Sequence, residues 1–322
     1  MPRRVIGQLG WVDSELGKRG ARRLDGLAKL GAMIDWQPFA RLLAGVNAAA
    51  KGEASYPPLM MFKVLLLQRW YTLSDPEMEA ALWDRVSFMS FVGLSLSDET
   101  PDHSTIWRFR QKLEQGGLAE RLFIELTRQL DARGLVVKRG TLIDASIITS
   151  AAHRPKMDQD KISPVDADAR FGATNERRRF AFGYKLHIAV DQGSSLIRHL
   201  LLTSANVQDV SVASALLPAQ AGMVYGDRAY DSAALRAELA AQRFGDGLMR
   251  RARRGQPLST DEVGHNHALS LVRRTVEKVF GTVKRSYGFA RMRYYNAARN
   301  RVAVLLACFA FNMRRSLRLL AA

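Results

Sequence analysis

The spacing of apolar residues changes near Gly134, and this change limits the folds that the chain can adopt. From Tyr56 to Gly134, Leu and Met recur at helical intervals, whereas residues 140–148 (GTLIDASII) have the pattern of a strand. The sequence therefore predicts an all-helical N-terminal domain over residues 1–134 and an α/β domain over residues 135–322.

Two helix starts are evident in the first domain. Ser74 precedes Asp-Pro-Glu, which predicts a capped helix with Pro in its first turn. Ser104 marks a second start, and the segment 105–113 behind it contains no acid. Its aromatic and basic side chains include Trp107, Arg108, Arg110 and Lys112. This segment either lies along DNA or is a solvated helix face.

Beyond Gly134, strands and helices alternate. Residues 151–182 mix charges with Pro and Gly, and they predict a loop or a ragged hairpin. Further strands are expected at 184–190, 197–202 and 222–225, and helices at 210–219, 232–242, 267–287 and 297–319. This order predicts a mixed sheet flanked by helices. The middle of the last helix is apolar enough to be buried in a core or a dimer seam.

The composition points to a polyanionic partner. The 322 residues include 48 Lys and Arg against 31 Asp and Glu, a formal charge of +17, so nucleic acid is the first partner expected. The single cysteine, Cys308, and six His offer no zinc-site spacing. With no signal-peptide core and no apolar run longer than residues 302–311, we expect a cytoplasmic, nucleoid-associated protein without membrane or small-molecule partners.

Asp144 is the first candidate catalytic acid, because it lies inside an otherwise apolar strand. Alternation places one set of side chains on its face: Leu142, Asp144, Ser146 and Ile148. An ionised acid there needs a partner, which is either an arginine on the sheet face or a bound ligand.

Asp227 is the second candidate. It follows a short strand that ends at Gly226, a position where open α/β sheets commonly place ligand-binding groups. The alternative role is a cap on the next helix, but Asp231 and Ser232 are better placed for that role.

Glu277 is the third candidate. It is the only acid between Val263 and Ala322, a stretch with twelve Lys or Arg. On a helix, Arg273, Glu277 and Lys284 fall within about 40° of each other, beside an apolar stripe of valines. The alternative is an Arg273–Glu277 surface pair that contributes only a few tenths of a kcal/mol.

Three carboxylates brought together would repel, by roughly 4 kcal/mol for a pair about 4 Å apart at an effective dielectric of 20. A divalent cation reverses the sign of that interaction. Oxygen ligands suit Mg²⁺ or Mn²⁺, and two such ions about 3.5–4 Å apart stabilise the attacking and leaving oxygens of a phosphoryl transfer.

Four segments together resemble the DDE transposases of the insertion-sequence-five group. They are PDHSTIWRFRQKL, TLIDASI, VYGDRAYDS and RRTVEKVFGTVKRSYG. The spacing of Arg273, Glu277 and Lys284 matches the signature helix of that group. One departure is Ser270, which stands where the signature has Tyr.

The resemblance implies a ribonuclease-H-like catalytic domain from about Gly134, with the first Asp on the opening strand, the second after the fourth strand and Glu on a late helix. It implies that Asp144, Asp227 and Glu277 hold two Mg²⁺ ions, for which Mn²⁺ substitutes. Metal-bound water would cut the transposon end, and the released 3′ hydroxyl would attack target DNA. Two ends must be held together, so at least a homodimer on DNA is expected.

The resemblance also suggests that the helical domain over residues 1–134 serves DNA binding and dimerisation, and it suggests individual DNA contacts. Arg273 and Lys284 would hold phosphates near the cut, and four lesser candidates for the rim are Arg228, Tyr230, Lys185 and His187. The basic residues of the earlier helical segment, Arg108, Arg110 and Lys112, complete the set of expected contacts. Each of the four rim candidates is alternatively an ordinary strand or loop side chain.

Three other residues compete for catalytic roles. Asp166 and Asp168 lie in a Pro- and charge-rich segment that positions ligands less rigidly than strands and helices, so we expect solvated loop residues. His103 is better explained by a helix start than as a general base.

Two other functions fit the same residues. One is a DNA-binding repressor without catalysis, against which the intact acids argue. The other is a ribonuclease-H-like nuclease that cuts DNA without joining strands.

Overall fold

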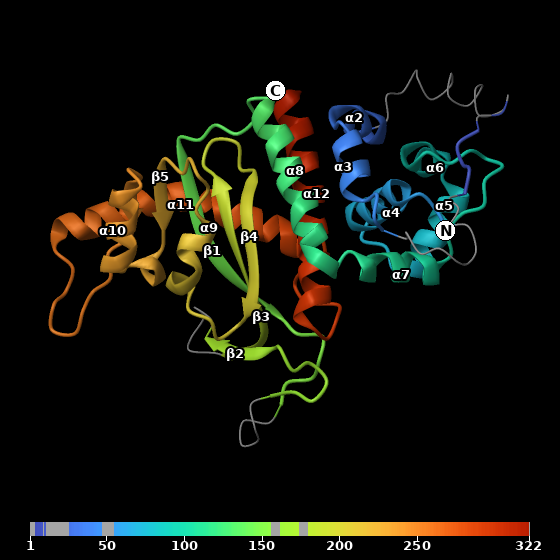
Figure 1. Ribbon diagram of the computed structural model, residues 1–322. Helices are drawn as coiled ribbons and strands as arrows, with labels where there is room; N and C mark the ends of the chain where they lie inside the picture. The colour runs from blue at the N-terminus through green and yellow to red at the C-terminus, as the bar shows by residue number, and fades with distance from the viewer. Residues whose placement is uncertain are drawn as a thin grey trace. The chain divides into compact units, whose positions relative to one another are not determined.

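The computed structural model describes residues 4–8, 10, 26–46, 55–155, 162–173 and 180–321. The chain forms two compact units, the first comprising residues 1–132 with 305–322 and the second residues 133–304 (Figure 1). The division falls two residues before the expected boundary at Gly134. It differs from the prediction in giving residues 305–322 to the first unit.

The first unit is helical, as predicted from Tyr56 onward. Its helices are α2 (Gly26–Met33), α3 (Gln37–Leu42), α4 (Pro58–Trp70), α5 (Asp75–Asp84), α6 (Val86–Val92), α7 (His103–Lys112) and α8 (Leu118–Ala132). A 3-10 turn, η1 (Gln115–Gly117), precedes α8, and the later part of α12 (Ala297–Leu320) also belongs to this unit.

Side-chain caps fix where two of these helices begin. Ser74 caps α5 in a capping box with Glu77, which confirms that predicted start. Helix α7 begins at His103, one residue before the predicted Ser104, because the Asp102 carboxylate accepts the backbone N–H of Thr105 at 2.6 Å. An Asp in this position is among the strongest N-caps.

The core of the first unit surrounds α4, whose side chains are almost all buried. The Phe309 ring lies 5.6 Å from Phe39 and 5.3 Å from Phe62 between centroids, and both pairs are edge-on. Trp70 donates its indole N–H to the carbonyl of Ala310 at 2.9 Å. Of the two alternatives for the last helix, the structure therefore selects the core.

Two charged side chains, Arg69 and Arg110, are buried in the described part of this unit. Arg110 is 4% exposed, and its guanidinium donates to Gln68 at 2.8 Å and to the Asp75 carboxylate. Burial alone would raise the pKa of Asp75, but the hydrogen bond and charge of Arg110 reverse this, so the pKa lies below its usual value.

The second unit contains a six-stranded mixed sheet. Its strands are β1 (Gly140–Thr149), β2 (Arg170–Ala173), β3 (Phe180–Asp191), β4 (Ile197–Ser204), β5 (Met223–Gly226) and β6 (Gly245–Leu248). Without the short β2, the order is β4-β3-β1-β5-β6, with β4, β3 and β1 antiparallel and β1, β5 and β6 parallel. This is the ribonuclease-H-like arrangement. When β2 is left out, β5 is the fourth strand along the chain, and Asp227 follows it directly.

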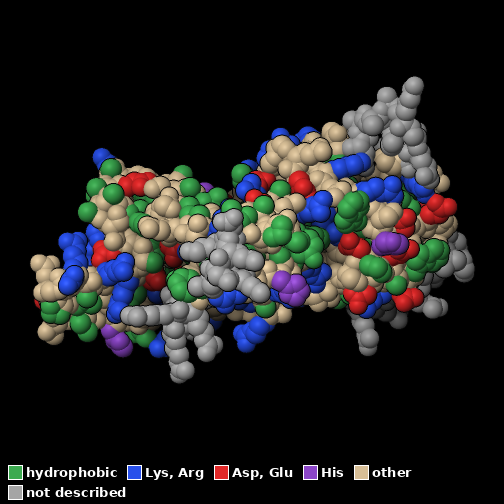
Figure 2. All heavy atoms as spheres, turned by 90° about the horizontal axis from the view of Figure 1, so that it is seen from below, with side chains coloured by type: hydrophobic (Ala, Val, Ile, Leu, Met, Phe, Trp, Pro, Cys, Tyr) green, Lys and Arg blue, Asp and Glu red, His purple; other side chains and the backbone are tan. Residues whose placement is uncertain are grey.

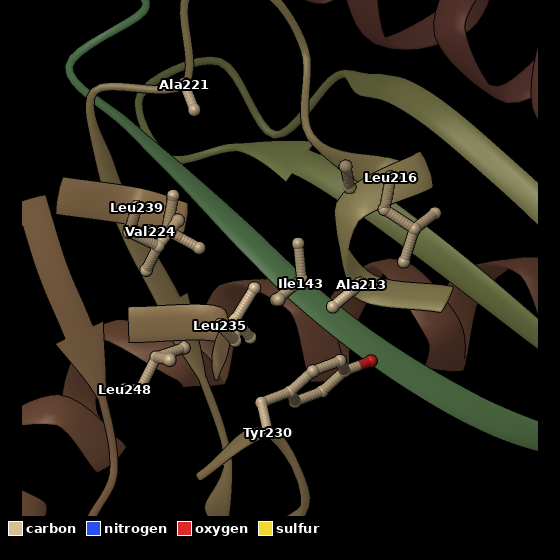
Figure 3. Close-up of a cluster of buried hydrophobic side chains, with 10 residues drawn as sticks. Ile143, Ala213, Leu216, Ala221, Val224, Tyr230, Leu235, Leu239 and Leu248 are labelled. Atoms are coloured by element: carbon tan, nitrogen blue, oxygen red, sulfur yellow. The ribbon is translucent and has the colours of Figure 1, made fainter. Parts of the chain in front are cut away.

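Helices lie against both faces of the sheet. Helix α9 (Ala213–Leu216) and helix α10 (Ala233–Ala241) pack on the face of Ile143, and Figure 3 shows Ile143 among Leu216, Leu235 and the ring of Tyr230. The opposite face, which carries Asp144, is met by α11 (Thr260–Ser286). Asp144 therefore points away from the apolar core and toward α11.

Most predicted elements of this unit are present, with three differences. The helix expected at 210–219 is only a 3-10 turn, η2 (Asp209–Val212), followed by α9, because Pro218 restricts the residue before it. Helix α11 begins seven residues before the predicted His267, capped by Ser259 and Glu262. Strand β6 was not predicted, since Gly-Asp-Gly has little strand propensity.

Among the residues that the structure describes, no helix is both long enough and apolar enough to span a membrane.

We predict that Arg110→Ala destabilises the first unit by about 3 kcal/mol, because it leaves the half-buried Asp75 carboxylate without the buried guanidinium that pairs with it. All five Trp lie within the first 107 residues, so urea unfolding followed by Trp fluorescence reports on this unit. Arg108→Ala, an exposed arginine on the same helix, is the matched control and is expected to change stability by less than about 0.5 kcal/mol. Equal stability of the two variants would contradict a structural role for Arg110.

Candidate active site

Asp144 and Asp227 are brought together by two neighbouring parallel strands. The ladder between β1 and β5 pairs Gly140 with Met223 and ends with Leu142 opposite Tyr225. Each aspartate lies two residues beyond that last pair, and adjacent strands are about 4.8 Å apart. The two carboxylates are therefore neighbours across the carboxyl end of β5.

The Asp144 carboxylate is in an unfavourable environment for a negative charge. Its side chain is only 15% exposed, and burial raises its pKa from 3.8 to about 6. The Arg273 guanidinium, 3.1 Å from Oδ2, opposes this rise, whereas the nearby Asp227 carboxylate adds to it. One arginine is thus insufficient to hold Asp144 at its ordinary acidity.

Asp227 also caps the turn that follows it. Its Oδ1 accepts the backbone N–H of Ala229 at 2.8 Å at the start of the 3-10 turn η3 (Arg228–Tyr230). The sequence favoured Asp231 and Ser232 over Asp227 as capping residues, but Asp227 does act as a cap. This hydrogen bond fixes one of its two carboxylate oxygens. Ser232 is the N-cap residue of α10 but its side chain makes no capping bond.

Glu277 lies on the side of α11 that meets β1. Arg273 contacts Asp144, and Lys284 donates from Nζ to the Ile147 carbonyl at 3.1 Å, so two residues on the same side of the helix as Glu277 reach β1. Burial lowers the pKa of Lys284. Glu277 itself is exposed.

A cavity of about 520 Å³ opens beside Asp227. Its lining combines one acid with three guanidinium groups and two apolar side chains: Asp227, Arg228, Ala229, Met249, Arg251 and Arg273. A predominantly cationic cavity next to a pair of carboxylates suits a ligand that carries phosphate groups.

Nowhere in the described ranges are three or more acidic, His or Cys side chains grouped closely enough to hold a metal ion. Arg273 supplies the positive charge that Asp144 needs. The absence of a third acid beside Asp144 and Asp227, in the part of the chain that is described, has a physical reason. A third carboxylate would be repelled by the pair unless a cation were present.

The residues nevertheless fit a divalent cation. Asp144 and Asp227 offer oxygen ligands, and the raised pKa of Asp144 shows that its negative charge is incompletely compensated. Within the part of the chain that the structure describes, the buried hydroxyl of Tyr230 and Nε of Arg273 have no hydrogen-bond partner. Burial raises the pKa of Tyr230, and the charges of Asp144 and Asp227 add to this rise. Arg273 donates a hydrogen bond to Asp144 from another of its guanidinium nitrogens, Nη2.

Two family models match this chain. Residues 18–112 match a family described as a transposase domain (DUF772), and residues 136–313 match the transposase DDE domain, which spans more than half of the sequence. The chain belongs to the DDE transposases. Its membership of the insertion-sequence-five group remains an expectation from the sequence motifs.

One solved structure among the matches is a crystal structure of a pre-cleavage Mos1 transpososome. It is 13% identical over 88% of this chain and 84% of that chain, with a TM-score of 0.20. A TM-score this low does not indicate superimposable structures, so the assignment as a transposase comes from the family models.

Two predicted DNA contacts of the transposase lie on the wrong face of the sheet. In the β1–β3 register, Lys185 is opposite Ile147 and His187 is opposite Ala145, so both point away from the face of Asp144. Lys185 pairs with Asp209 at 2.8 Å. His187 is fully buried, and burial together with Lys185 lowers its pKa to about 4.

Two further predicted contacts are buried. Tyr230 is part of the apolar cluster in Figure 3, and Arg110 belongs to the ion pair of the first unit. Tyr230, Arg110 and His187 are buried, so we reassign them from DNA contacts to structural roles. The exposed members of the predicted set are Arg108, Lys112 and Arg228.

The expectation of solvated aspartates in the segment before β2 is wrong for Asp166. It is fully buried and accepts hydrogen bonds from Ser150 Oγ, at 2.5 Å, and from the Tyr184 hydroxyl. Asp168 is exposed and accepts the backbone N–H of Ala297, at the start of α12. Asp166 therefore ties this segment to the sheet, and Asp168 ties it to α12. Among the described residues, neither aspartate forms a hydrogen bond with Asp144.

Residues 151–182 were predicted to form a loop or a ragged hairpin. In the described part of this segment, β2 pairs antiparallel with the start of β3, which agrees with a hairpin. Residues 156–161 and 174–179 lie outside the described residues. His103 also has a structural environment, with Nδ1 2.8 Å from the Glu79 carboxylate at the start of α7.

We predict that Asp144→Asn stabilises the metal-free transposase near neutral pH. An acid whose folded-state pKa is raised loses stability as the pH rises from about 4 to about 6, and Asn does not titrate. The advantage at pH 7 should be on the order of 3 kcal/mol, since the rise in pKa from 3.8 to about 6 already includes the Arg273 ion pair and each pH unit between the two values is worth about 1.4 kcal/mol.

Urea unfolding in EDTA, followed by circular dichroism at several pH values, measures this effect. The variant and the wild type should have similar stability near pH 4 and diverge above pH 6. Parallel pH profiles would show that Asp144 is not destabilised in the folded state.

Proposed function

We propose that this transposase cuts DNA at the ends of its own insertion sequence and joins the freed 3′ hydroxyl to target DNA. The observation that carries this proposal is the pair of neighbouring aspartates, one inside β1 and one directly after β5, beside a cavity walled by arginines. Paired acids suit metal-dependent phosphoryl transfer, and the arginines suit the phosphates of the substrate.

Asp144, Asp227 and Glu277 would hold Mg²⁺, with Mn²⁺ as a substitute. When bound, two such ions lower the pKa of water and stabilise the oxygens of an in-line displacement. Glu277 is the acid of α11 that shares a helix side with Arg273 and Lys284, which both reach β1. Its approach to the two aspartates is opposed by like charge and favoured by a cation.

The protein side chains would bind and orient the DNA. Arg273 pairs with Asp144 in the metal-free site, and its guanidinium would be available to bind a phosphate if a cation compensated the charge of Asp144. Arg228 is exposed at the cavity wall and would hold a neighbouring phosphate. The Asp144 side chain is largely buried, which would limit the access of water to groups that react beside it.

The first unit would contribute recognition of the element's ends. Helix α7 exposes Trp107, Arg108 and Lys112, and it carries no acid. Exposed basic side chains bind phosphates, and exposed aromatic rings add apolar contact. Because two ends must be held together, we propose at least a homodimer on DNA, acting at the nucleoid.

We predict that Asp144→Ala, Asp227→Ala and Glu277→Ala each reduce Mg²⁺-dependent cleavage and joining by at least about a hundredfold, since each removes a proposed metal ligand. A labelled DNA end incubated with target plasmid measures cleavage and strand transfer in one reaction. A wild-type chain that cleaves the end without joining it would be a nuclease.

Asp261→Asn is the matched control, because Asp261 is an exposed acid at the other end of the helix that carries Glu277. It should retain nearly full activity. Substantial activity in any one of the three alanine variants would remove that residue from the metal site.

We further predict opposite effects of Glu277→Gln on binding and on catalysis. In EDTA the variant loses a negative charge near the DNA, so its affinity for DNA should be equal to or higher than that of the wild type. In Mg²⁺ it lacks a metal ligand and should lose cleavage. Equal or tighter binding with cleavage intact would instead identify Glu277 as a surface partner of Arg273.

A further inference from the structure

The segment between β6 and α11 is rich in arginine. Residues 249–256, here named the arginine loop, contain Arg250, Arg251, Arg253 and Arg254, and the sequence has no acid from Gly247 to Thr260. Figure 2 shows Lys and Arg side chains gathered around recessed acidic side chains at the end of the second unit that carries α10 and α11. The loop was not among the predicted DNA contacts.

The sheet topology places this loop beside the aspartate pair. Strand β6 is parallel to β5, and Gly226 is paired with Leu248 at the end of the ladder. Asp227 and Met249 therefore both leave the sheet at its carboxyl edge. Arg251 lines the same cavity as Asp227 and Arg273.

The backbone of the loop is held by buried and ion-paired groups. Asn266 of α11, only 4% exposed, accepts the Arg250 N–H at 2.7 Å and donates to the Arg250 carbonyl at 2.9 Å. Asp231 accepts the Arg251 N–H at 2.7 Å and is itself held by Arg236 at 2.8 Å. Two successive residues are thus fixed by side chains from outside the loop.

The tip of the loop is also ordered by its own hydrogen bonds. Arg253 and Gln256 exchange backbone bonds at 3.1 and 3.0 Å, and Gly255 has a φ of +76°, a conformation that favours glycine. This turn holds Arg253 and Arg254 exposed beyond the cavity. The fixed backbone lowers the ordering cost of binding a ligand.

The four arginines differ in how their charges are compensated. Arg250 pairs with Asp246 at 3.3 Å and so has a structural partner. Arg251 is exposed, and no carboxylate among the described residues lies within ion-pairing distance of its guanidinium. An exposed guanidinium on a fixed backbone, with further arginines beside it, matches a ligand that carries several phosphates in a row.

We propose that the arginine loop is a phosphate-binding element that holds the DNA backbone next to Asp227. Arg251 contacts a phosphate, and Asn266 and Asp231 are positioning residues that act through the backbone of Arg250 and Arg251. The proposal rests on the proposed function in one respect, namely that DNA is the ligand of the second unit.

The test measures binding of the full-length chain to a random-sequence DNA duplex in EDTA over a range of salt concentrations. Arg251→Gln should weaken binding and reduce the slope of log affinity on log salt by about 0.9, the value for one phosphate of duplex DNA. Arg251→Lys keeps the charge and should keep the wild-type slope.

Arg243→Gln is the matched control. Arg243 is equally exposed and lies just before β6, at the opposite end of that strand from the arginine loop. Its loss removes the same charge and should leave the slope unchanged. An unchanged slope for Arg251→Gln, or an equal change for both glutamine variants, would overturn the proposal.

Failure of this proposal and failure of the proposed function give different results. A wild-type chain that does not bind duplex DNA would overturn both. Wild-type binding and Mg²⁺-dependent cleavage together with a normal slope for Arg251→Gln would overturn the arginine loop alone. A reduced slope for Arg251→Gln in a chain that never cleaves DNA would support the loop and contradict the catalytic function.

A double-mutant cycle tests the positioning role. Asn266→Ala removes no charge, yet it should weaken DNA binding because it releases the backbone of Arg250. If Asn266 acts through Arg251, then Asn266→Ala combined with Arg251→Gln should bind no more weakly than Arg251→Gln alone. Additive losses would remove Asn266 from the binding element.

Discussion

The parallel pairing of β1 with β5 is the interaction on which the active site depends. It joins two segments that are distant in the sequence and places Asp144 beside Asp227. Gly140 permits the close approach, since a Cβ there would lie 2.7 Å from the Tyr225 ring of β5. A side chain at this position would push β1 away from β5 and separate the acids.

That pairing imposes an electrostatic cost, and Arg273 compensates for part of it. Asp144 is buried next to a second carboxylate, and the guanidinium of Arg273 is its recorded ionic partner. The same arginine also faces the cavity beside Asp227. The metal-free site is thus a balance of fixed charges in which the guanidinium of Arg273 partly offsets the charge of Asp144.

The sequence predicted those features that depend on local pattern. The strand around Asp144, the strand before Asp227 and the helix around Glu277 all follow from periodicity, and they are present. Whether Asp144, Asp227 and Glu277 act together as metal ligands remains a prediction.

Features that depend on register or on tertiary contacts were not predictable from the sequence. Lys185 and His187 were expected at the rim, but their face is decided by which residue of β1 each one opposes. Arg110 and Asp166 have the sequence context of surface residues, and their burial depends on partners in other elements. Strand β6 forms because β5 offers it an edge, despite its poor intrinsic propensity.

Helix α12 has a consequence for the synthesis of the chain. Phe309 and Ala310 of this helix pack against Phe39 of α3 and against Phe62 and Trp70 of α4, in the core of the first unit. During translation the first unit remains without these residues until the second unit has been made. A chain interrupted within the catalytic unit therefore lacks a finished helical unit as well.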